Sequence, residues 1–139
     1  MKLSLNPNTY LQAEGKELFL FGLRWSFGFW LLYVGAMKWI NGPAGFIGYI
    51  GKDFANAWPP EIMITVLGWI IVVAEPLLGL LLIIGWRPRL VWLATAKLMW
   101  ILMFGKTIVQ DYPTVANNWQ YFVLALAACC LTPPEKSSE

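Results

Sequence analysis

Four long apolar stretches, separated by short polar segments rich in proline and glycine, divide the chain. An apolar helix of about 20 residues is long enough to cross the hydrocarbon core of a bilayer. We therefore predict an all-α, polytopic membrane four-helix bundle, with one domain over residues 1–139. The predicted spans cover about residues 18–40, 61–86, 90–109 and 115–131.

The segment between the first two spans, residues 44–58, is too short and too rich in glycine to span a bilayer. It nevertheless carries six large apolar side chains. They are Phe46, Ile47, Tyr49, Ile50, Phe54 and Trp58. We predict a short interfacial or re-entrant segment at the membrane face. The functional alternative is a lid over a site between the helices.

One face of the first span carries two cations and two glycines. Arg24, Gly28, Leu31, Gly35 and Lys38 are spaced by four, three, four and three residues, which places them within an arc of about 80°. An arginine within an apolar helix costs on the order of 3 kcal/mol on insertion scales, so it usually faces protein or water and has a partner. This face is therefore expected to meet an acidic group from another helix.

The second span carries the acidic residue best placed for that role. Gly68, Glu75 and Gly79 share one face of the helix, together with Leu82. Pro76 removes one backbone hydrogen bond and disfavours the helical conformation of the residue before it, so we predict a kink there.

Glycines on such faces allow helices to approach closely. Gly28, Gly35, Gly68 and Gly79 are therefore expected at helix–helix contacts.

The composition supports a membrane protein and excludes several other classes. The chain is 58% hydrophobic and only 13% charged, whereas a soluble domain is about 25% charged. The net charge is +2 and the cations are scattered, so nucleic-acid binding is not indicated. Residues 1–17 contain no continuous apolar core, so we expect an uncleaved first helix rather than a cleavable signal peptide.

The residues that usually hold redox groups are scarce. The chain has no histidine, the usual axial ligand of b-type haem and the commonest metal ligand. Its two cysteines, Cys129 and Cys130, are adjacent and do not form a C-x-x-C pair, so they are interpreted as small packing residues. We expect no haem, metal or covalently bound cofactor, and any redox chemistry would use a diffusible organic carrier or the cofactor of a partner.

Four spans place both termini on one side of the membrane, and the loop cations indicate which side. The side with the termini carries five cations, against Lys52 in the opposite loops. The five are Lys2, Lys16, Arg87, Arg89 and Lys136. Because cytoplasmic loops carry an excess of lysine and arginine, we predict cytoplasmic N- and C-termini.

Depth along the helices predicts the partner of the arginine. Counting 1.5 Å per residue from the ends of the spans places Arg24, Glu75 and Lys97 in the inner half of the bilayer. We therefore expect Arg24 or Lys97 within ion-pair distance of Glu75. One carboxylate between two cations would leave a net positive hollow suited to an anionic or polar-headed ligand. The alternative is a structural Arg24–Glu75 pair, with Lys97 reaching the membrane surface.

A second polar zone is expected at the outer face. It consists of Lys38, Asp53, Lys106 and Asp111. It is either a binding zone or an ordinary ring of interfacial charges.

The order of these features resembles the DoxX/DoxD family of small four-helix membrane proteins. Arg24 is followed by Gly28, and then by Gly35 and the dipeptide Lys38-Trp39; in the second span Glu75 precedes Gly79 and a run of aliphatic residues that ends in Gly85 and Arg89. The resemblance covers about residues 18–110 and weakens in the last span. Pro76 and the nine tryptophans depart from the family pattern.

The resemblance implies a bacterial or archaeal plasma-membrane protein. Some relatives are the membrane subunit of thiosulfate:quinone oxidoreductase, which passes electrons from a small sulfur anion to a membrane quinone. In that case the chain is a quinone-dependent oxidoreductase subunit that acts with a partner. Other relatives are accessory or anchor subunits of larger redox complexes. Apart from the resemblance, a third hypothesis is a small transporter or channel with Glu75 as a relay, but four short helices without an inverted repeat leave little scope for alternating access.

The resemblance also implies where a quinone would bind. Either the Arg24 and Lys97 region or the outer zone of Lys38 would hold the sulfur anion or the quinone oxygens. Trp30 and Trp100 would flank the quinone ring.

Overall fold

Six α-helices follow one another in the computed structural model, which describes residues 6–12 and 14–134 and has no strand in that part of the chain. They are α1 (Pro7–Leu11), α2 (Gly15–Ile40), α3 (Pro43–Asp53), α4 (Glu61–Ile84), α5 (Pro88–Ile108) and α6 (Tyr112–Leu131). The short helix α1 was not expected from the polar N-terminal segment. Lys2 and Lys136, used above to orient the chain, lie outside the described residues.

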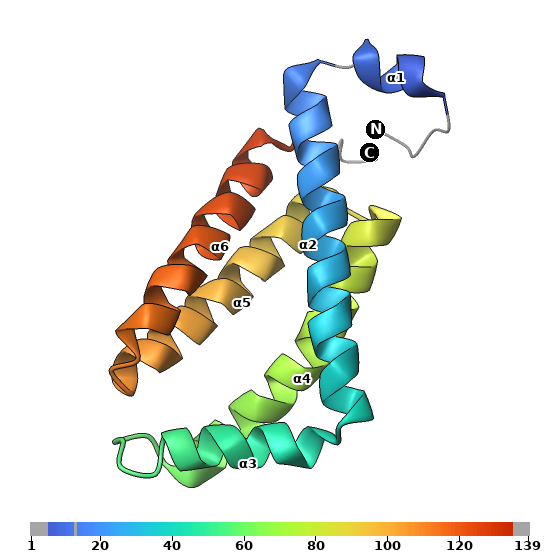
Figure 1. Cartoon of the computed structure of the whole chain (residues 1–139). Helices are drawn as coiled ribbons and strands as arrows, with labels where there is room; N and C mark the ends of the chain where they lie inside the picture. Colours follow the sequence, from blue (N-terminus) through green and yellow to red (C-terminus); the bar gives the residue numbers. More distant parts are fainter. Residues whose placement is uncertain (1–5, 13, 135–139) are drawn as a thin grey trace, which may run out of the picture.

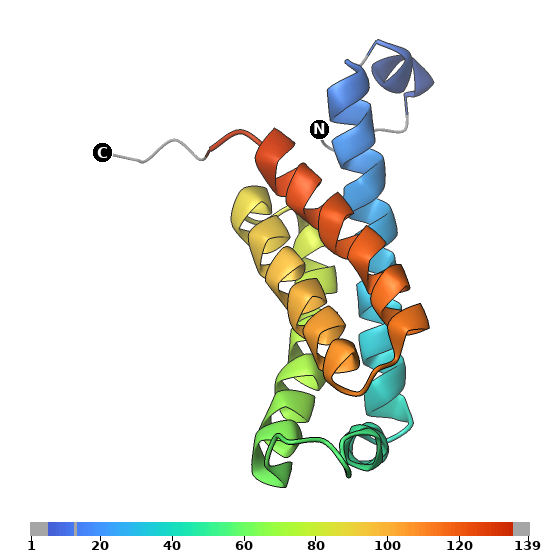
Figure 2. The same cartoon turned by 90° about the vertical axis from the view of Figure 1, so that its left-hand side faces the viewer.

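Three of the helices are long and apolar enough to cross a membrane, namely α2, α4 and α5. The fourth predicted span, α6, has 20 residues and is about 30 Å long. Polar side chains in its opening turns, Asn117, Asn118 and Gln120, lower its hydropathy. It nevertheless runs alongside α5 for most of its length (Figures 1 and 2). The structure therefore confirms an all-α membrane protein with three span-capable helices.

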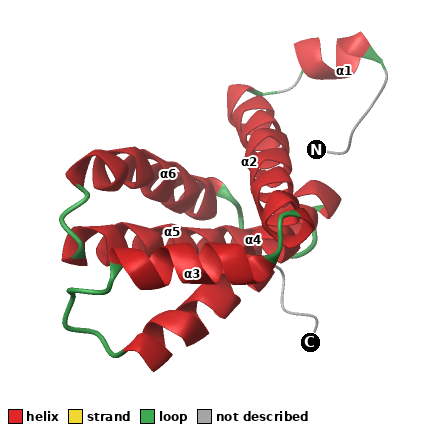
Figure 3. Ribbon diagram, turned by 60° about the horizontal axis from the view of Figure 1, so that its bottom comes forward, coloured by secondary structure: helices red, strands yellow, loops and turns green. Residues whose placement is uncertain are grey.

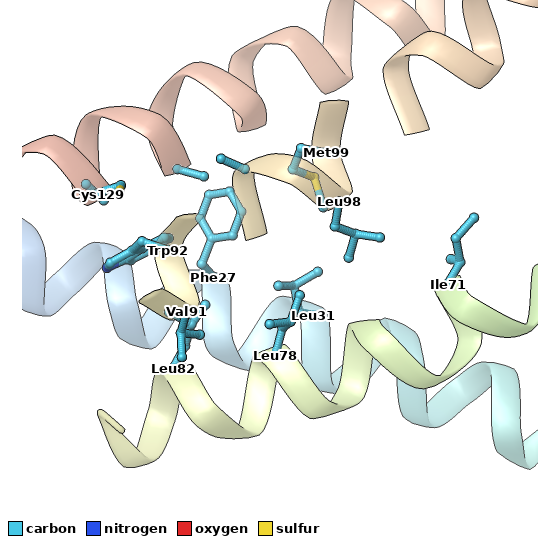
Figure 4. Close-up of a cluster of buried hydrophobic side chains, with 13 residues drawn as sticks. Phe27, Leu31, Ile71, Leu78, Leu82, Val91, Trp92, Leu98, Met99 and Cys129 are labelled. Atoms are coloured by element: carbon cyan, nitrogen blue, oxygen red, sulfur yellow. The ribbon is translucent and has the colours of Figure 1, made fainter. Parts of the chain in front are cut away.

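The long helices form two antiparallel pairs, α2 with α4 and α5 with α6 (Figure 1). Aromatic side chains join the pairs: the Phe27 ring of α2 lies edge-on to Trp92 of α5 at 5.6 Å and to Tyr121 of α6 at 5.9 Å. Figure 4 shows the core around these contacts, where side chains of α2, α4 and α5 converge. This apolar cluster is the main contact between the two pairs, and its burial stabilises their packing.

Glycines set the close approach of α2 and α4. A Cβ at Gly28 would lie 3.0 Å from the Gly79 carbonyl oxygen, and one at Gly35 would lie 2.6 Å from the Pro76 nitrogen. Gly68 packs in the same way against Ile50 of α3. The four glycines thus lie at helix–helix contacts, which is the placement expected from their shared faces.

The helix α3 runs across the end of α2 and along the first half of α4 (Figures 1 and 3). Only Asn41 and Gly42 separate it from α2, and Gly42 has a φ of 88°, a conformation that favours glycine. Its apolar residues are explained by this packing, because Ile50 is buried on α4 while Tyr49 remains exposed. Residues 44–58, predicted as an interfacial or re-entrant segment, are therefore mostly a regular helix.

Glycine also ends α4, two residues before the predicted boundary at Trp86. Gly85 has a φ of 77° and donates its N–H to the Leu82 carbonyl, and the Trp86 N–H reaches the Leu81 carbonyl at 3.2 Å. These two bonds form a Schellman motif, which satisfies the last carbonyls of the helix. The chain then turns through Arg87 into Pro88, the first residue of α5.

Candidate functional site

A buried ion pair joins α2 to α4. The Lys38 Nζ lies 2.5 Å from the Glu75 Oε2, and the two side chains are 17% and 6% exposed. Charges are rarely buried to this extent unless they are paired. Glu75 is the one buried carboxylate among the residues that the structure describes.

The local sequence explains why these two residues meet. Lys38 is in the last turn of α2, one turn after Gly35. Glu75 directly precedes Pro76, the residue that Gly35 contacts. Because the helices are antiparallel and touch backbone to backbone at this contact, the Lys38 ammonium, one turn further along α2, reaches the Glu75 carboxylate beside Pro76.

A tryptophan supports the helix at Pro76. Proline has no N–H, so it leaves the carbonyl four residues earlier, that of Val72, without its helical partner. The Trp39 Nε1 donates to the Val72 carbonyl oxygen at 3.0 Å and takes this place. Pro76, which departs from the family pattern, is therefore compensated by Trp39, which is part of that pattern. Trp39 was not among the predicted site residues, although its position beside Lys38 pointed to it.

We expect Trp39→Phe to destabilise the protein by about 1–3 kcal/mol, because a buried carbonyl would lose its only side-chain donor. Thermal unfolding in detergent would measure the loss. In a Pro76→Ala background, a backbone N–H becomes available at position 76, so Trp39→Phe should cost much less there. Equal costs in both backgrounds would show that the indole matters only through packing.

An apolar groove opens above Lys38 between α2 and α3. The groove has a volume of about 420 Å³. Residues that line it include Tyr33, Met37, Lys38, Asn41, Phe46 and Tyr49. The Lys38 Nζ lies 4.0 Å from the centre of the Phe46 ring, a cation–π distance. The ammonium thus has a carboxylate on one side and an aromatic face on the other, at the edge of a largely apolar space.

A second charged cluster joins α3 to the α5–α6 turn. The Lys106 Nζ lies 2.5 Å from the Asp53 Oδ2 and 3.2 Å from the Asp111 Oδ2, and 5.5 Å from the Tyr49 ring. Asp111 also caps α6 by accepting the Thr114 N–H. Hydrogen bonds from Thr114, and secondarily from Lys106, lower the pKa of the Asp111 carboxyl. The predicted outer zone is thus two separate ion-pair clusters, one at each end of α3.

The predicted pairing of Glu75 with Arg24 or Lys97 is wrong, since the partner of Glu75 is Lys38. The depth estimate assumed that neighbouring spans begin and end at the same level. In the structure α4 begins beyond the end of α2, and α3 packs on these first turns of α4. The middle of α4 therefore lies level with the last turn of α2 (Figure 1). The positive hollow predicted around Glu75, Arg24 and Lys97 is therefore not formed.

Arg24 lies at the other end of the α2–α4 pair. A Cβ at Gly85 would lie 2.7 Å from the Arg24 Nη1, so the guanidinium covers the C-terminal end of α4. The carbonyl end of a helix carries a partial negative charge that favours a cation. The Phe21 ring lies beside the same guanidinium, 5.8 Å from its carbon. The position of Arg24 is thus explained by the end of α4 rather than by Glu75.

The remaining predicted residues are dispersed. Lys97 is exposed on α5. The Trp30 ring packs on Tyr121 of α6, with 4.6 Å between the ring centres, and Trp100 stacks on Phe104 on the exposed side of α5. Neither tryptophan lines the groove at Lys38. Their role beside a quinone ring stays a prediction.

One of three comparisons with known proteins found a match, and it is to a protein family. A search of curated proteins and a search of solved structures each returned no match. The family model for DoxX matches residues 19–107, which is well over half of the chain. The match includes both members of the Lys38–Glu75 pair and the glycines between α2 and α4. The chain therefore belongs to the DoxX family.

Proposed function

We propose that this chain is the membrane subunit of a quinone-linked redox system, similar to thiosulfate:quinone oxidoreductase, and that it binds the quinone head in the groove at Lys38. The observation that carries the proposal is a hydrogen-bonding cation at the edge of an apolar groove. In this reading the chain supplies the quinone site, and a partner supplies the other redox centre.

The groove fits a quinone in size and chemistry. Its volume of about 420 Å³ lies within the usual range for small-molecule sites, which are mostly apolar with a few polar groups. The Lys38 ammonium and the Asn41 amide both line it and can donate to carbonyl oxygens. A bound quinone would supply the electron-accepting carbonyls.

Each residue of the groove then has a definite task. Lys38 donates a hydrogen bond to a quinone oxygen, and Glu75 holds the ammonium in place. Phe46 and Tyr49 of α3 lie along the ring and exclude water. The low dielectric of such a site strengthens the hydrogen bond from the ammonium.

A second candidate is a non-catalytic subunit that anchors or stabilises a larger redox complex. This second candidate is favoured by the contacts of the Lys38 ammonium, which already has a carboxylate at 2.5 Å and the centre of an aromatic ring at 4.0 Å. In this reading the pair only fixes the register of α2 against α4.

We also propose that all four long helices cross a prokaryotic plasma membrane, with cytoplasmic termini. The antiparallel course of α6 beside α5 and the basic turn at Arg87 and Arg89 support this orientation (Figure 2). A reporter enzyme that is active only outside the cytoplasm, fused after residue 139, is expected to be inactive. The same reporter inserted after Ala57 is expected to be active, and the reverse pattern would contradict the orientation.

Extraction of the purified protein tests the quinone site. We expect the native chain, purified in mild detergent, to retain quinone that organic solvent releases. The double variant Lys38→Met/Glu75→Leu removes the donor and leaves no unpaired charge, so it should fold and lose the quinone. Lys97→Met is the matched control, because it removes an exposed lysine outside the groove and should retain quinone.

The two candidates give different results in this experiment. Equal retention by the native chain and the double variant would contradict a site at Lys38. Absence of quinone from all variants, even after incubation with a soluble short-chain quinone, together with a stable complex with a partner protein, would favour the anchoring role.

A further inference from the structure

A second groove lies between α5 and α6, at the end that carries the α4–α5 turn. Its volume is about 580 Å³. Its wall is apolar, with Leu90 and Leu93 from α5 and Leu126 from α6, and Arg87 and Arg89 stand at its rim with the exposed Cys130. It is remote from the groove at Lys38, which lies between α2 and α3.

The chain fixes the geometry of this groove at two points. Arg87 has a φ of 37° and turns the chain directly into α5, whose first residue is Pro88. On the facing helix, the Cys129 thiol donates to the Arg89 carbonyl oxygen at 3.5 Å. This contact ties the end of α6 to the first turn of α5, so the two arginines are held at the mouth of a defined space rather than on a free loop.

We propose that this groove binds an anionic phospholipid, with the phosphate between Arg87 and Arg89 and an acyl chain along the leucines. Planar guanidinium groups bind phosphate oxygens through paired hydrogen bonds. Basic pockets between membrane helices bind anionic lipid headgroups in this way.

Neighbouring residues match the depth of a lipid headgroup. The Trp86 ring lies 5.7 Å from the guanidinium carbon of Arg87 and is half exposed. Tryptophan is enriched at the boundary between headgroups and acyl chains, so this residue marks the level of the arginines as interfacial. Leu90 directly follows Arg89, and Leu93 lies one turn beyond Arg89 along α5, toward the level of the acyl chains.

The proposal also accounts for Lys97. This residue lies on the same face of α5 as Leu90 and Leu93, seven and four positions further on. It is exposed, and no carboxylate pairs with it among residues 6–12 and 14–134. An exposed cation on a spanning helix is costly unless it reaches an interface or an anion. A phosphate bound at the N-terminal end of this face would be an anion toward which the Lys97 side chain can extend.

The shape of the groove selects a lipid rather than a soluble phosphate. A free phosphate or a small phosphate ester would use the two arginines and leave the leucine wall uncovered. A phospholipid covers both parts at once, and each arginine near an anionic lipid surface is worth about a fivefold change in binding. Acyl-chain burial along the wall adds to that attraction.

Cys130 provides a native reporter of occupancy. Both cysteines of the chain line the groove, but Cys130 is exposed whereas Cys129 is buried. We expect the chain in phosphatidylcholine vesicles to react with N-ethylmaleimide at Cys130, and the rate to fall at least about fivefold when phosphatidylglycerol is included. Native mass spectrometry of the protein from the mixed vesicles should show retained phosphatidylglycerol.

Variants separate a specific site from general attraction to a charged membrane. Arg87→Gln/Arg89→Gln should abolish both the protection of Cys130 and the retained lipid, whereas Arg87→Lys/Arg89→Lys should keep part of each. Lys52→Gln is the control, because it removes a cation from α3 and should behave like the native chain. Comparing the two vesicle types within each variant cancels any change in the intrinsic reactivity of the thiol.

Three results would overturn the proposal. They are equal labelling rates in the two kinds of vesicle, unchanged protection in the glutamine variant, and equal protection by soluble glycerol phosphate in phosphatidylcholine vesicles. The last result would assign the arginines to a soluble phosphate instead. None of these measurements depends on quinone, so this proposal and the proposed function can fail separately.

Discussion

Replacing Gly79 by alanine is expected to force α2 and α4 apart and to destabilise the protein by about 1–3 kcal/mol, the usual cost of overpacking. The added methyl group would lie 2.7 Å from the Gly28 carbonyl oxygen and 2.9 Å from the Leu32 Cα, and closer still to the Leu32 nitrogen. These are backbone atoms, so no change of rotamer can relieve the collision. The thermal midpoint in detergent should therefore fall clearly.

Gly22→Ala is the matched control on the same pair of helices. Gly22 lies in α2, and a methyl group added there would have no neighbouring side chain or helix within 4 Å. Alanine is a better helix former than glycine by about 1 kcal/mol, and this variant should be as stable as the native chain or more stable. If Gly79→Ala were equally harmless, the close packing of α2 on α4 would be contradicted.

Lys38→Met is expected to destabilise the protein by about 3–5 kcal/mol, because it leaves the Glu75 carboxylate buried without a partner. Adding Glu75→Leu should recover most of the loss, since a buried ion pair can be replaced by apolar side chains of similar size at little cost. A double-mutant cycle, measured by thermal or denaturant unfolding in detergent, isolates this coupling.

The cluster at Lys106 serves as the control for that cycle. Its partner Asp53 is 30% exposed, so solvent screens the pair, and Asp53→Ala should cost only about 0.2–1 kcal/mol. A loss as large as that of Lys38→Met would mean that burial does not distinguish the two clusters. If the Lys38→Met/Glu75→Leu variant does not recover the stability lost in Lys38→Met, the pair does more than neutralise charge.

Periodicity and composition predicted three of the long helices as spans and the helix contacts at the glycines. The lengths of the apolar stretches identified α2, α4 and α5 as spans. The thickness of a bilayer sets a minimum length for an apolar helix, and soluble proteins rarely contain several helices that reach it. The shared faces of the glycines predicted where helices touch, since only small residues allow backbones to approach. Both properties are local, so a single sequence contains them.

The partner of Glu75 was not predictable by the same means. It depends on how far α4 is displaced along α2, and α3 packs on the part of α4 that extends beyond the end of α2. Counting residues from the end of each span contains no information about such an offset. The spacing of Gly35 and Lys38 against Pro76 and Glu75 was the better indication, because close contact at one turn determines what meets at the next.

The two-residue connection between α2 and α3 joins the helix that carries Lys38 to the helix that carries its aromatic cover. Asn41 and Gly42 form the connection, Asn41 lines the groove, and Phe46 covers the ammonium from one turn further along. A rotation about this hinge would move the aromatic cover and widen the entrance in a single step. Access for a lipid-soluble molecule and hydration of the buried charge would then rise and fall together.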